Sequence, residues 1–337
     1  MKTIQLLSSS LCFVLLLAAC KKDSDKTTPQ PDVYVAGYEY NGTNYVAKLW
    51  KNDTAQDLGA SPGFAEARSV AVSGNDVYVA GTQYNGARAV ARVWKNGIPQ
   101  DLSDGTHSAQ ARSLYVSGSD VYVAGYEYNG SSNVAKYWKN GVAQDLSDGT
   151  QDVNAHSIYV SGNDVYVGGT VFTGSTSVAT LWKNGVGQAL SDGTQLGAAY
   201  AVFVSGSDVY VAGSKHNGSA HTAFFWKNGV EQKLTDGSHH AAAFSIHASG
   251  SDVYVAGYEH NGTNYVAKLW KNGMAQNLSD GTNSAEANSV FVLGNDVYVA
   301  GSEKKGSLSK IRLWKNGVAQ NFANGNSDEY ALGVFVR

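Results

Sequence analysis

The sequence repeats itself every 44 residues. The tetrapeptide Asp-Val-Tyr-Val begins at seven positions separated by this step, from Asp32 to Asp296. All seven tryptophans keep the same step, from Trp50 to Trp314, with no residue inserted or missing. A fixed period of this length indicates a supersecondary unit that buries its apolar faces only by packing against copies of itself.

Each unit contains four short segments with strand character. In the second unit these are DVYVAGTQY, AVARVWK, IPQDL and RSLYVSG, and in most units Asn-Gly separates the second segment from the third. Asn-Gly is typical of a two-residue hairpin turn, because both turn residues take positive φ. Helical periodicity of useful length is missing after residue 20. We therefore predict an all-β fold with four antiparallel strands per unit.

The two ends of the repeat region predict a closed ring. Residues 32–337 number 306, two fewer than seven times 44. The first unit opens on its Asp-Val-Tyr-Val strand, and the last unit stops after Gly333-Val334-Phe335-Val336-Arg337. An open stack would leave both segments as unpaired edges, whereas in a ring the last strand pairs beside the first. The prediction is a seven-bladed β-propeller whose first blade is completed by residues 331–337.

This pattern resembles seven-bladed propellers of the broad WD-repeat-like kind, and more closely the "WKNG" repeat lipoproteins of Gram-negative bacteria. The motif that carries the resemblance is the Trp-Lys-Asn-Gly hairpin, as at Trp138-Lys139-Asn140-Gly141. The resemblance covers residues 32–337 and implies the architecture. It brings no catalytic residues with it, because neither the Ser-x-Asp-x-Gly-x-x-Trp box of sialidases nor the Gly-His and Trp-Asp pairs of true WD repeats occur.

The start of the chain differs from the repeats. Lys2 precedes an apolar run over residues 11–19, which is typical of a secretory signal peptide. The sequence Leu17-Ala18-Ala19-Cys20 resembles the lipobox of bacterial lipoproteins, in which the signal is cut before the cysteine and the cysteine is lipidated. The resemblance implies a signal peptide over residues 1–19 and acyl chains, such as palmitate, on Cys20. An ordinary signal with an incidental cysteine is the alternative.

The lipoprotein resemblance also implies a cellular location. Lys21 stands where Asp would signal retention in the inner membrane, so we expect the outer membrane, on its periplasmic or its cell-surface side. Residues 20–31 are polar and contain proline, as expected of a flexible tether. With Cys12 inside the signal, Cys20 is the one cysteine left, which excludes a disulfide or a cysteine-based zinc site.

Composition excludes some partners. The formal net charge is −3 and no long run of like charge occurs, so nucleic acid is not expected as a partner. We expect a monomer without a cofactor, attached to the membrane through its lipid.

A binding site is expected where the units differ, because residues shared by every unit serve the architecture. Just before the innermost strand, one position changes its chemistry from unit to unit. Its occupants are Arg68, Arg112, His156, Tyr200, Phe244, Asn288 and Leu332. A short way upstream, His107 and His239 occupy a second variable position. Cations on one side and aromatic rings on the other suit a polar ligand with apolar faces, such as a glycan, a peptide or a loop of a partner protein. The alternative is drift on a solvated surface.

Histidines form a second asymmetry. Five of them fall in loops that we expect at one end of the blades: His216, His221, His239, His240 and His260. Imidazoles bind zinc or copper, but no fixed ligand spacing occurs, so the sequence leaves metal binding open.

The favoured function is a non-catalytic binding or interaction scaffold, and the alternative is a glycan-active hydrolase or lyase. Hydrolysis would need two carboxylates facing each other within roughly 5–10 Å. The candidates are Glu39, Glu127, Glu259 and Glu303 at strand ends, and Glu66, Asp152, Glu286, Asp328 and Glu329 in loops. They form no motif, and most units substitute other residues at these positions.

Overall fold

The computed structural model describes residues 30–59, 63–320, 322–323 and 325–337. Contacts divide the chain into Met1–Pro31 and Asp32–Arg337, and the second unit is described here by itself. The predicted signal peptide, Cys20 and most of the tether lie outside the described residues. Among the residues described, no helix has the length and apolarity needed to cross a membrane.

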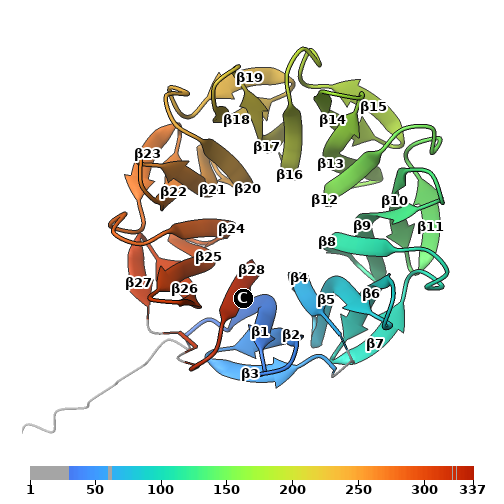
Figure 1. The fold of residues 1–337 in the computed structure, drawn as a ribbon, viewed down its shortest axis with the longest axis horizontal. Helices are drawn as coiled ribbons and strands as arrows, with labels where there is room; N and C mark the ends of the chain where they lie inside the picture. Colours follow the sequence, from blue (N-terminus) through green and yellow to red (C-terminus); the bar gives the residue numbers. More distant parts are fainter. Residues whose placement is uncertain (1–29, 60–62, 321, 324) are drawn as a thin grey trace, which may run out of the picture. The chain divides into compact units, whose positions relative to one another are not determined.

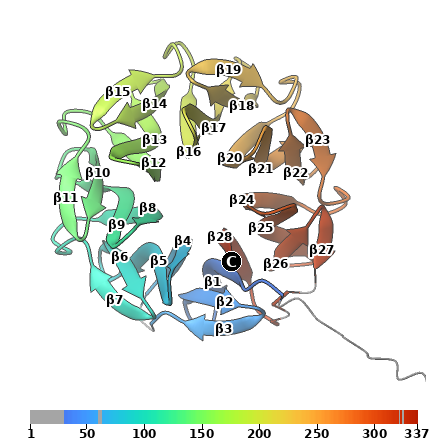
Figure 2. The ribbon, with the colours of Figure 1, turned by 180° about the vertical axis from the view of Figure 1, so that it is seen from behind.

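Residues 32–337 form seven four-stranded antiparallel sheets arranged as the blades of a ring, which confirms the predicted fold class. Figure 1 and Figure 2 show the ring from its two ends, with one strand of each blade nearest the centre. We number the blades from 1, which contains β1, to 7 along the chain. The inner strands, in the order of blades 1 to 7, are β28 (Glu329–Val336), β4 (Ala65–Ser73), β8 (Ala109–Ser117), β12 (Val153–Ser161), β16 (Gly197–Ser205), β20 (Ala241–Ser249) and β24 (Ala285–Leu293).

The other three strands of each blade follow outward from the centre. The second strands are β1 (Val33–Tyr40), β5 (Asp76–Tyr84), β9 (Asp120–Tyr128), β13 (Asp164–Phe172), β17 (Asp208–His216), β21 (Asp252–His260) and β25 (Asp296–Lys305). The third strands are β2 (Tyr45–Lys51), β6 (Ala89–Lys95), β10 (Asn133–Lys139), β14 (Ser177–Lys183), β18 (His221–Lys227), β22 (Tyr265–Lys271) and β26 (Leu308–Lys315). The outer strands are β3 (Thr54–Asp57), β7 (Ile98–Asp101), β11 (Val142–Asp145), β15 (Val186–Ala189), β19 (Val230–Lys233), β23 (Met274–Asn277) and β27 (Val318–Gln320).

Blade 1 is built from both ends of the chain, as the sequence predicts. Strand β28 pairs with β1, with Val33 opposite Val336 and Glu39 opposite Glu329. Asp32 N donates to Arg337 O at 2.8 Å, and Arg337 N donates to Asp32 O at 3.1 Å. The pairing removes two free strand edges and closes the ring.

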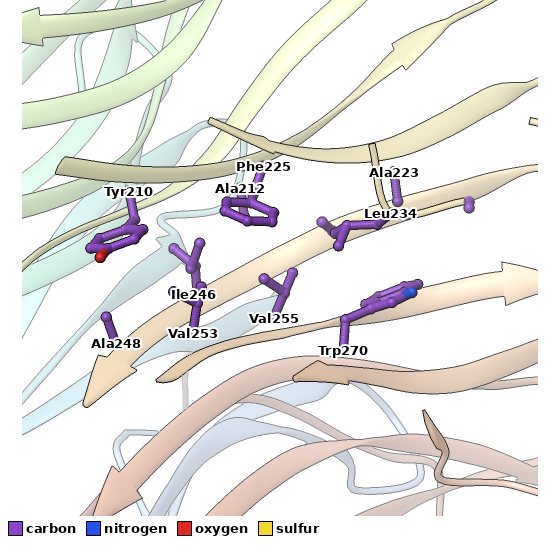
Figure 3. Packing of buried hydrophobic residues seen from close by; sticks show 12 residues of the cluster. Tyr210, Ala212, Ala223, Phe225, Leu234, Ile246, Ala248, Val253, Val255 and Trp270 are labelled. Atoms are coloured by element: carbon purple, nitrogen blue, oxygen red, sulfur yellow. The ribbon is translucent and has the colours of Figure 1, made fainter. Parts of the chain in front are cut away.

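The hydrophobic core lies between neighbouring blades. Between blades 5 and 6, Tyr210 and Phe225 face Ile246, Val255 and Trp270 (Figure 3). The equivalent clusters recur around the ring, and each of the seven tryptophans has at most 4% of its surface exposed. The tryptophans are therefore architectural, as their presence in every unit predicts, because each fills the space between two blades.

Every inner strand contains a β-bulge at the same position. In β4, Ala67 lies opposite Gly81 and Ser69 lies opposite Ala80, so Arg68 has no partner in β5. A Cβ atom on Gly81 would lie 2.0 Å from the carbonyl oxygen of Glu66. The bulge thus brings the inner strand so close to the second strand that only glycine fits opposite it.

Serine hydroxyls join neighbouring inner strands one residue beyond the bulge. Leu114 N of blade 3 donates to Ser69 Oγ of blade 2 at 3.1 Å. The same bond recurs at four further junctions, with Ser113, Ser157, Ser245 and Ser289 as acceptors. Ala201 and Gly333 stand at the other two junctions, so the serines stabilise five of the seven contacts between inner strands.

Blade 4 offers a test of this packing within one strand. Gly169 occupies the position opposite the bulge, and its Cβ would lie 2.2 Å from Asn154 O, whereas a Cβ on Gly168 would lie no closer than 3.6 Å to any atom. We expect Gly169→Ala to lower the free energy of unfolding by about 3 kcal/mol through overpacking. Gly168→Ala should raise it by roughly 0.4–1 kcal/mol, because alanine restricts the unfolded chain. Denaturant titrations of both variants check this, and equal effects would contradict the close approach.

Candidate functional site

The seven bulge residues meet in one cavity on the axis of the ring. The cavity measures about 380 Å³ and takes lining residues from all seven inner strands. Its wall contains Arg68, Arg112, His156, Tyr200, Phe244, Asn288 and Leu332. Each of these is the residue that the bulge leaves unpaired.

The bulge residues lie elsewhere along the strands than the sequence predicts. These residues lie inside the inner strands, not in the loops before them, because the strands begin earlier than predicted, as β4 does at Ala65. The bulge bends the strand and turns the unpaired residue away from the ladder, which leaves its side chain free to point into the cavity.

Blades 2 and 3 supply the cationic arc of the wall. Arg68 Nε lies 2.5 Å from Glu66 Oε1, and the Glu66 side chain is only 5% exposed. Arg112 makes a different set of contacts: its Nη2 donates to Tyr126 Oη at 3.1 Å, and its guanidinium lies 5.4 Å from the centroid of that ring. The two arginines at this repeat position therefore differ in their partners: Arg68 pairs with a carboxylate, whereas Arg112 contacts a neutral tyrosine.

Blades 4 to 6 supply an aromatic arc. The rings of His156 and Tyr200 lie 5.6 Å apart, as do those of Tyr200 and Phe244, and Tyr258 lies 5.4 Å beyond Phe244. His156 Nε2 lies 3.1 Å from Thr170 Oγ1. Burial, together with the positive charges of Arg112 and Arg68, lowers the pKa of His156 to about 3. His156 is therefore neutral at physiological pH, and it continues the aromatic surface.

Blade 7 contributes an amide and a carboxylate. Asn288 Nδ2 donates to Ala331 O of blade 1 at 2.9 Å. Glu286 lines the cavity and also a neighbouring pocket of about 430 Å³, whose wall includes Tyr265 and Tyr330. Burial raises the pKa of Glu286, so this carboxyl holds a proton more readily than an exposed one. Sequence reasoning placed Glu286 in a loop, whereas it lies in β24 beside the bulge.

A belt of aromatic side chains lies three residues beyond the bulge, and sequence reasoning missed it. Successive rings along the inner strands lie 4.4–5.2 Å apart. The belt consists of Tyr115, Tyr159, Phe203, His247, Phe291 and Phe335, and Ala71 occupies the position in blade 2. An available signal was the aromatic residue at one repeat position in six of the seven units.

His107 and His239 are not part of the cavity wall. His107 lies 6.5 Å from the ring of Tyr128, and His239 lies 6.4 Å from the ring of His260, both next to turns between second and third strands. The structure therefore brings the seven residues of the first variable position together and leaves the two histidines of the second outside the cavity wall.

The remaining histidines form a small group at blades 5 and 6. The rings of His216 and His221 lie 5.1 Å apart, and those of His221 and His240 lie 5.9 Å apart. His221 N donates to His240 Nδ1 at 3.1 Å. Within the described part of the chain, no group of three or more His, Cys, Asp or Glu side chains is arranged to hold a metal ion.

The carboxylates considered for hydrolysis are mostly occupied by protein contacts. The strand-end glutamates form ion pairs at 2.6–2.9 Å, for example Glu127 with Lys136 and Glu303 with Arg312. Asp152 and Asp328 accept backbone N–H groups at 2.7 Å. Among the described residues that line the cavity, Glu286 is the single carboxylate. The cavity wall therefore does not present the pair of carboxylates that glycoside hydrolysis usually needs.

Solved structures share the fold of this chain at low sequence identity. The β-propeller domain of the Trilobed protease from Pyrococcus furiosus, described as having an open velcro topology, is 9% identical with a TM-score of 0.55, covering 87% of this chain and 92% of that one. The acylaminoacyl peptidase of Pyrococcus horikoshii is 10% identical with a TM-score of 0.55, covering 87% of this chain and 51% of that one. This chain thus spans about half the length of that peptidase.

A third structure, a putative TolB from Agrobacterium tumefaciens, is 11% identical with a TM-score of 0.46, covering 91% of this chain and 99% of that one. The sequence matches no known protein family and no curated protein. At these identities the two Pyrococcus structures show the β-propeller fold alone.

The lowered pKa of His156 predicts a pH dependence of stability. The unfolded chain binds a proton at His156 near pH 6.5, whereas the folded protein binds it only near pH 3. The stabilisation is therefore complete above about pH 6.5 and is lost as the pH falls toward 3. His247, whose pKa burial lowers to about 4, acts in the same direction.

We expect His156→Gln, which removes the ionisable group, to flatten this dependence. Urea titrations between pH 7.5 and pH 4.5 should show the native protein losing more unfolding free energy than the variant, which retains His247. Parallel losses in both proteins would contradict a neutral, desolvated His156.

Proposed function

We propose that this protein is an outer-membrane-anchored lipoprotein whose β-propeller is a non-catalytic binding module for a glycan, peptide or protein partner. The observation that carries the proposal is the convergence of seven bulge residues, of six residue types, on one cavity. A ring of equal blades would present equal side chains there, whereas this wall changes from guanidinium groups through aromatic rings to an amide. Concave sites with a few polar groups among apolar ones are the usual form of small-ligand pockets.

The position of Asp32 in the propeller agrees with an anchor at the N-terminal end. Val33 pairs with Val336 at the end of β28, and Glu39 pairs with Glu329 at its beginning. Asp32 therefore lies at the end of blade 1 at which β28 ends. Residues 21–31 could span at most about 40 Å when extended. A lipid on Cys20 would hold the propeller within this distance of the membrane.

The anchor predicts a difference between the two cysteines. Cys20→Ser should abolish acylation and move the protein out of the outer-membrane fraction, because it removes the thiol at the lipobox position that accepts the lipid. Cys12→Ser, inside the predicted signal, should leave both unchanged and serves as the matched control. Membrane fractionation and intact mass spectrometry would measure this. A Cys20→Ser protein still found acylated in the outer membrane would contradict the proposal.

The cavity predicts that Tyr200 contributes to ligand binding. A soluble chain from residue 21 onward is to be probed on glycan and peptide arrays, and the best ligand measured by titration calorimetry. We expect Tyr200→Ala to weaken binding at least about tenfold, since a buried aromatic contact contributes on the order of 1–2 kcal/mol. Tyr128→Ala is the control, because Tyr128 is exposed and lies outside the cavity wall. Equal affinity of Tyr200→Ala and the parent would place the binding site elsewhere.

A further inference from the structure

The repeat contains two versions of one arginine site. Blades 2 and 3 both carry arginine at the bulge, but the residue two positions earlier is Glu66 in blade 2 and Gln110 in blade 3. Glu66 forms an ion pair with Arg68 at 2.5 Å. Gln110 cannot neutralise Arg112, and Gln110 Oε1 and Arg112 Nε are both buried without a hydrogen-bond partner among the described residues.

Among the described residues, no carboxylate forms an ion pair with Arg112. Arg112 contacts the neutral Tyr126, through one hydrogen bond and the face of the ring. Of the other groups that line the cavity, Arg68 is neutralised by Glu66, His156 is neutral, and Glu286 belongs to blade 7, more than two blades away along the ring. A half-buried cation without a counter-ion is unfavourable, and a bound anion would relieve this cost.

The geometry of a guanidinium selects among anions. Its planar array of N–H donors matches the two oxygens of a carboxylate, which it binds with two parallel hydrogen bonds. Arg112 uses one of its five N–H donors in the described structure. The wall of the cavity thus has an unused donor set suited to a carboxylate.

The rest of the wall favours a sugar over a peptide as the bearer of that carboxylate. Tyr200 and Phe244 line the cavity with aromatic rings, and the apolar face of a pyranose ring packs on aromatic side chains. Ser113 Oγ and Ser157 Oγ accept backbone N–H groups, which leaves each O–H free to donate to ligand hydroxyls. A volume of about 380 Å³ suits one or two sugar rings better than a folded peptide loop.

We propose that the central cavity binds an acidic sugar residue of the uronic-acid type, with its carboxylate on Arg112 and its ring against Tyr200 and Phe244. The inference rests on the proposed function as a binding module and adds the chemical class of the ligand. Arg112 is the residue that distinguishes acidic from neutral sugars, and Gln110 is the residue that leaves Arg112 available.

The test uses the full-length protein in detergent and two disaccharides that differ at one group. One ends in glucuronic acid and the other in glucose, so a carboxylate replaces a CH₂OH group. Calorimetry should show the acidic disaccharide binding roughly 10- to 100-fold more tightly than the neutral one, as expected for hydrogen bonds to a charged group. This preference should disappear in Arg112→Gln, with binding of the neutral disaccharide unchanged.

The sharper variant is Gln110→Glu, which copies the Glu66–Arg68 pair of blade 2 into blade 3. It keeps Arg112 and adds its missing counter-ion, so we expect the same 10- to 100-fold loss for the acidic disaccharide and none for the neutral one. A purely structural role of Arg112 would predict no such loss, because the new ion pair would hold the side chain more firmly. Arg88→Gln, at an exposed arginine outside the cavity wall, is the control and should retain the preference.

The outcomes separate this inference from the proposed function. Equal binding of both disaccharides, unchanged by Gln110→Glu, would overturn the acidic-sugar inference and leave the binding module intact. If a peptide with a free C-terminal carboxylate bound in an Arg112-dependent manner and neither disaccharide did, the assignment to a sugar would be wrong. Absence of any ligand on glycan and peptide arrays would overturn both.

Discussion

The β-bulge in each inner strand is the feature on which the remainder of the molecule depends. The inner strand approaches the second strand so closely that a Cβ on the facing glycine would lie about 2 Å from a backbone oxygen. This glycine is the last residue of the Asp-Val-Tyr-Val-(Ala/Gly)-Gly phrase that every unit repeats. The glycine that every unit repeats therefore accommodates the bulge, which is the irregular position in each sheet. Without the bulge, the residue that lines the cavity would be paired within the ladder.

The bulge also separates the tasks of the inner strand. Before the bulge, Ala67 and its equivalents are completely buried against the preceding blade, and after it Val70 and its equivalents belong to the same core between blades. The bulge residue contacts the cavity and has no cross-strand partner, so the architecture places few demands on its side chain. Chemical difference among the blades can accumulate there without disturbing the packing, which explains how one backbone repeats seven times while the wall is asymmetric.

Much of the fold could be predicted from the sequence, because a period of 44 residues without insertions requires every unit to meet its neighbours in the same way. The pairing of β28 with β1 followed from the missing first strand and the extra last one. Sequence reasoning missed the bulge, although the apolar positions change phase there, from Ala65 and Ala67 before it to Val70 after it. As a result, the predicted site residues were placed in loops.

The site could be predicted only in part. The variable position was visible as a series of unlike residues, but nothing in the sequence shows that His107 and His239 lie beside Tyr128 and His260, outside the cavity wall. The aromatic belt from Tyr115 to Phe335 was visible only as a shared residue type, which in a repeat protein first suggests core packing. The belt depends on closure of the propeller, because each aromatic side chain contacts the next only when all inner strands converge on the axis.

The difference between Glu66 and Gln110 shows how a repeat protein can acquire a charged site without a change in its backbone. A carboxylate replaced by an amide leaves the strand, the bulge and the neighbouring arginine in place, as the equal registers of β4 and β8 show. The change removes one ion pair and leaves two polar atoms unsatisfied, which costs roughly 1–3 kcal/mol for each buried group. The other six blades retain their full packing, so a ring of this size tolerates the loss. Blade 2 shows the same arginine in a satisfied state, and the uncompensated charge in blade 3 is therefore a property of one residue and not of the fold.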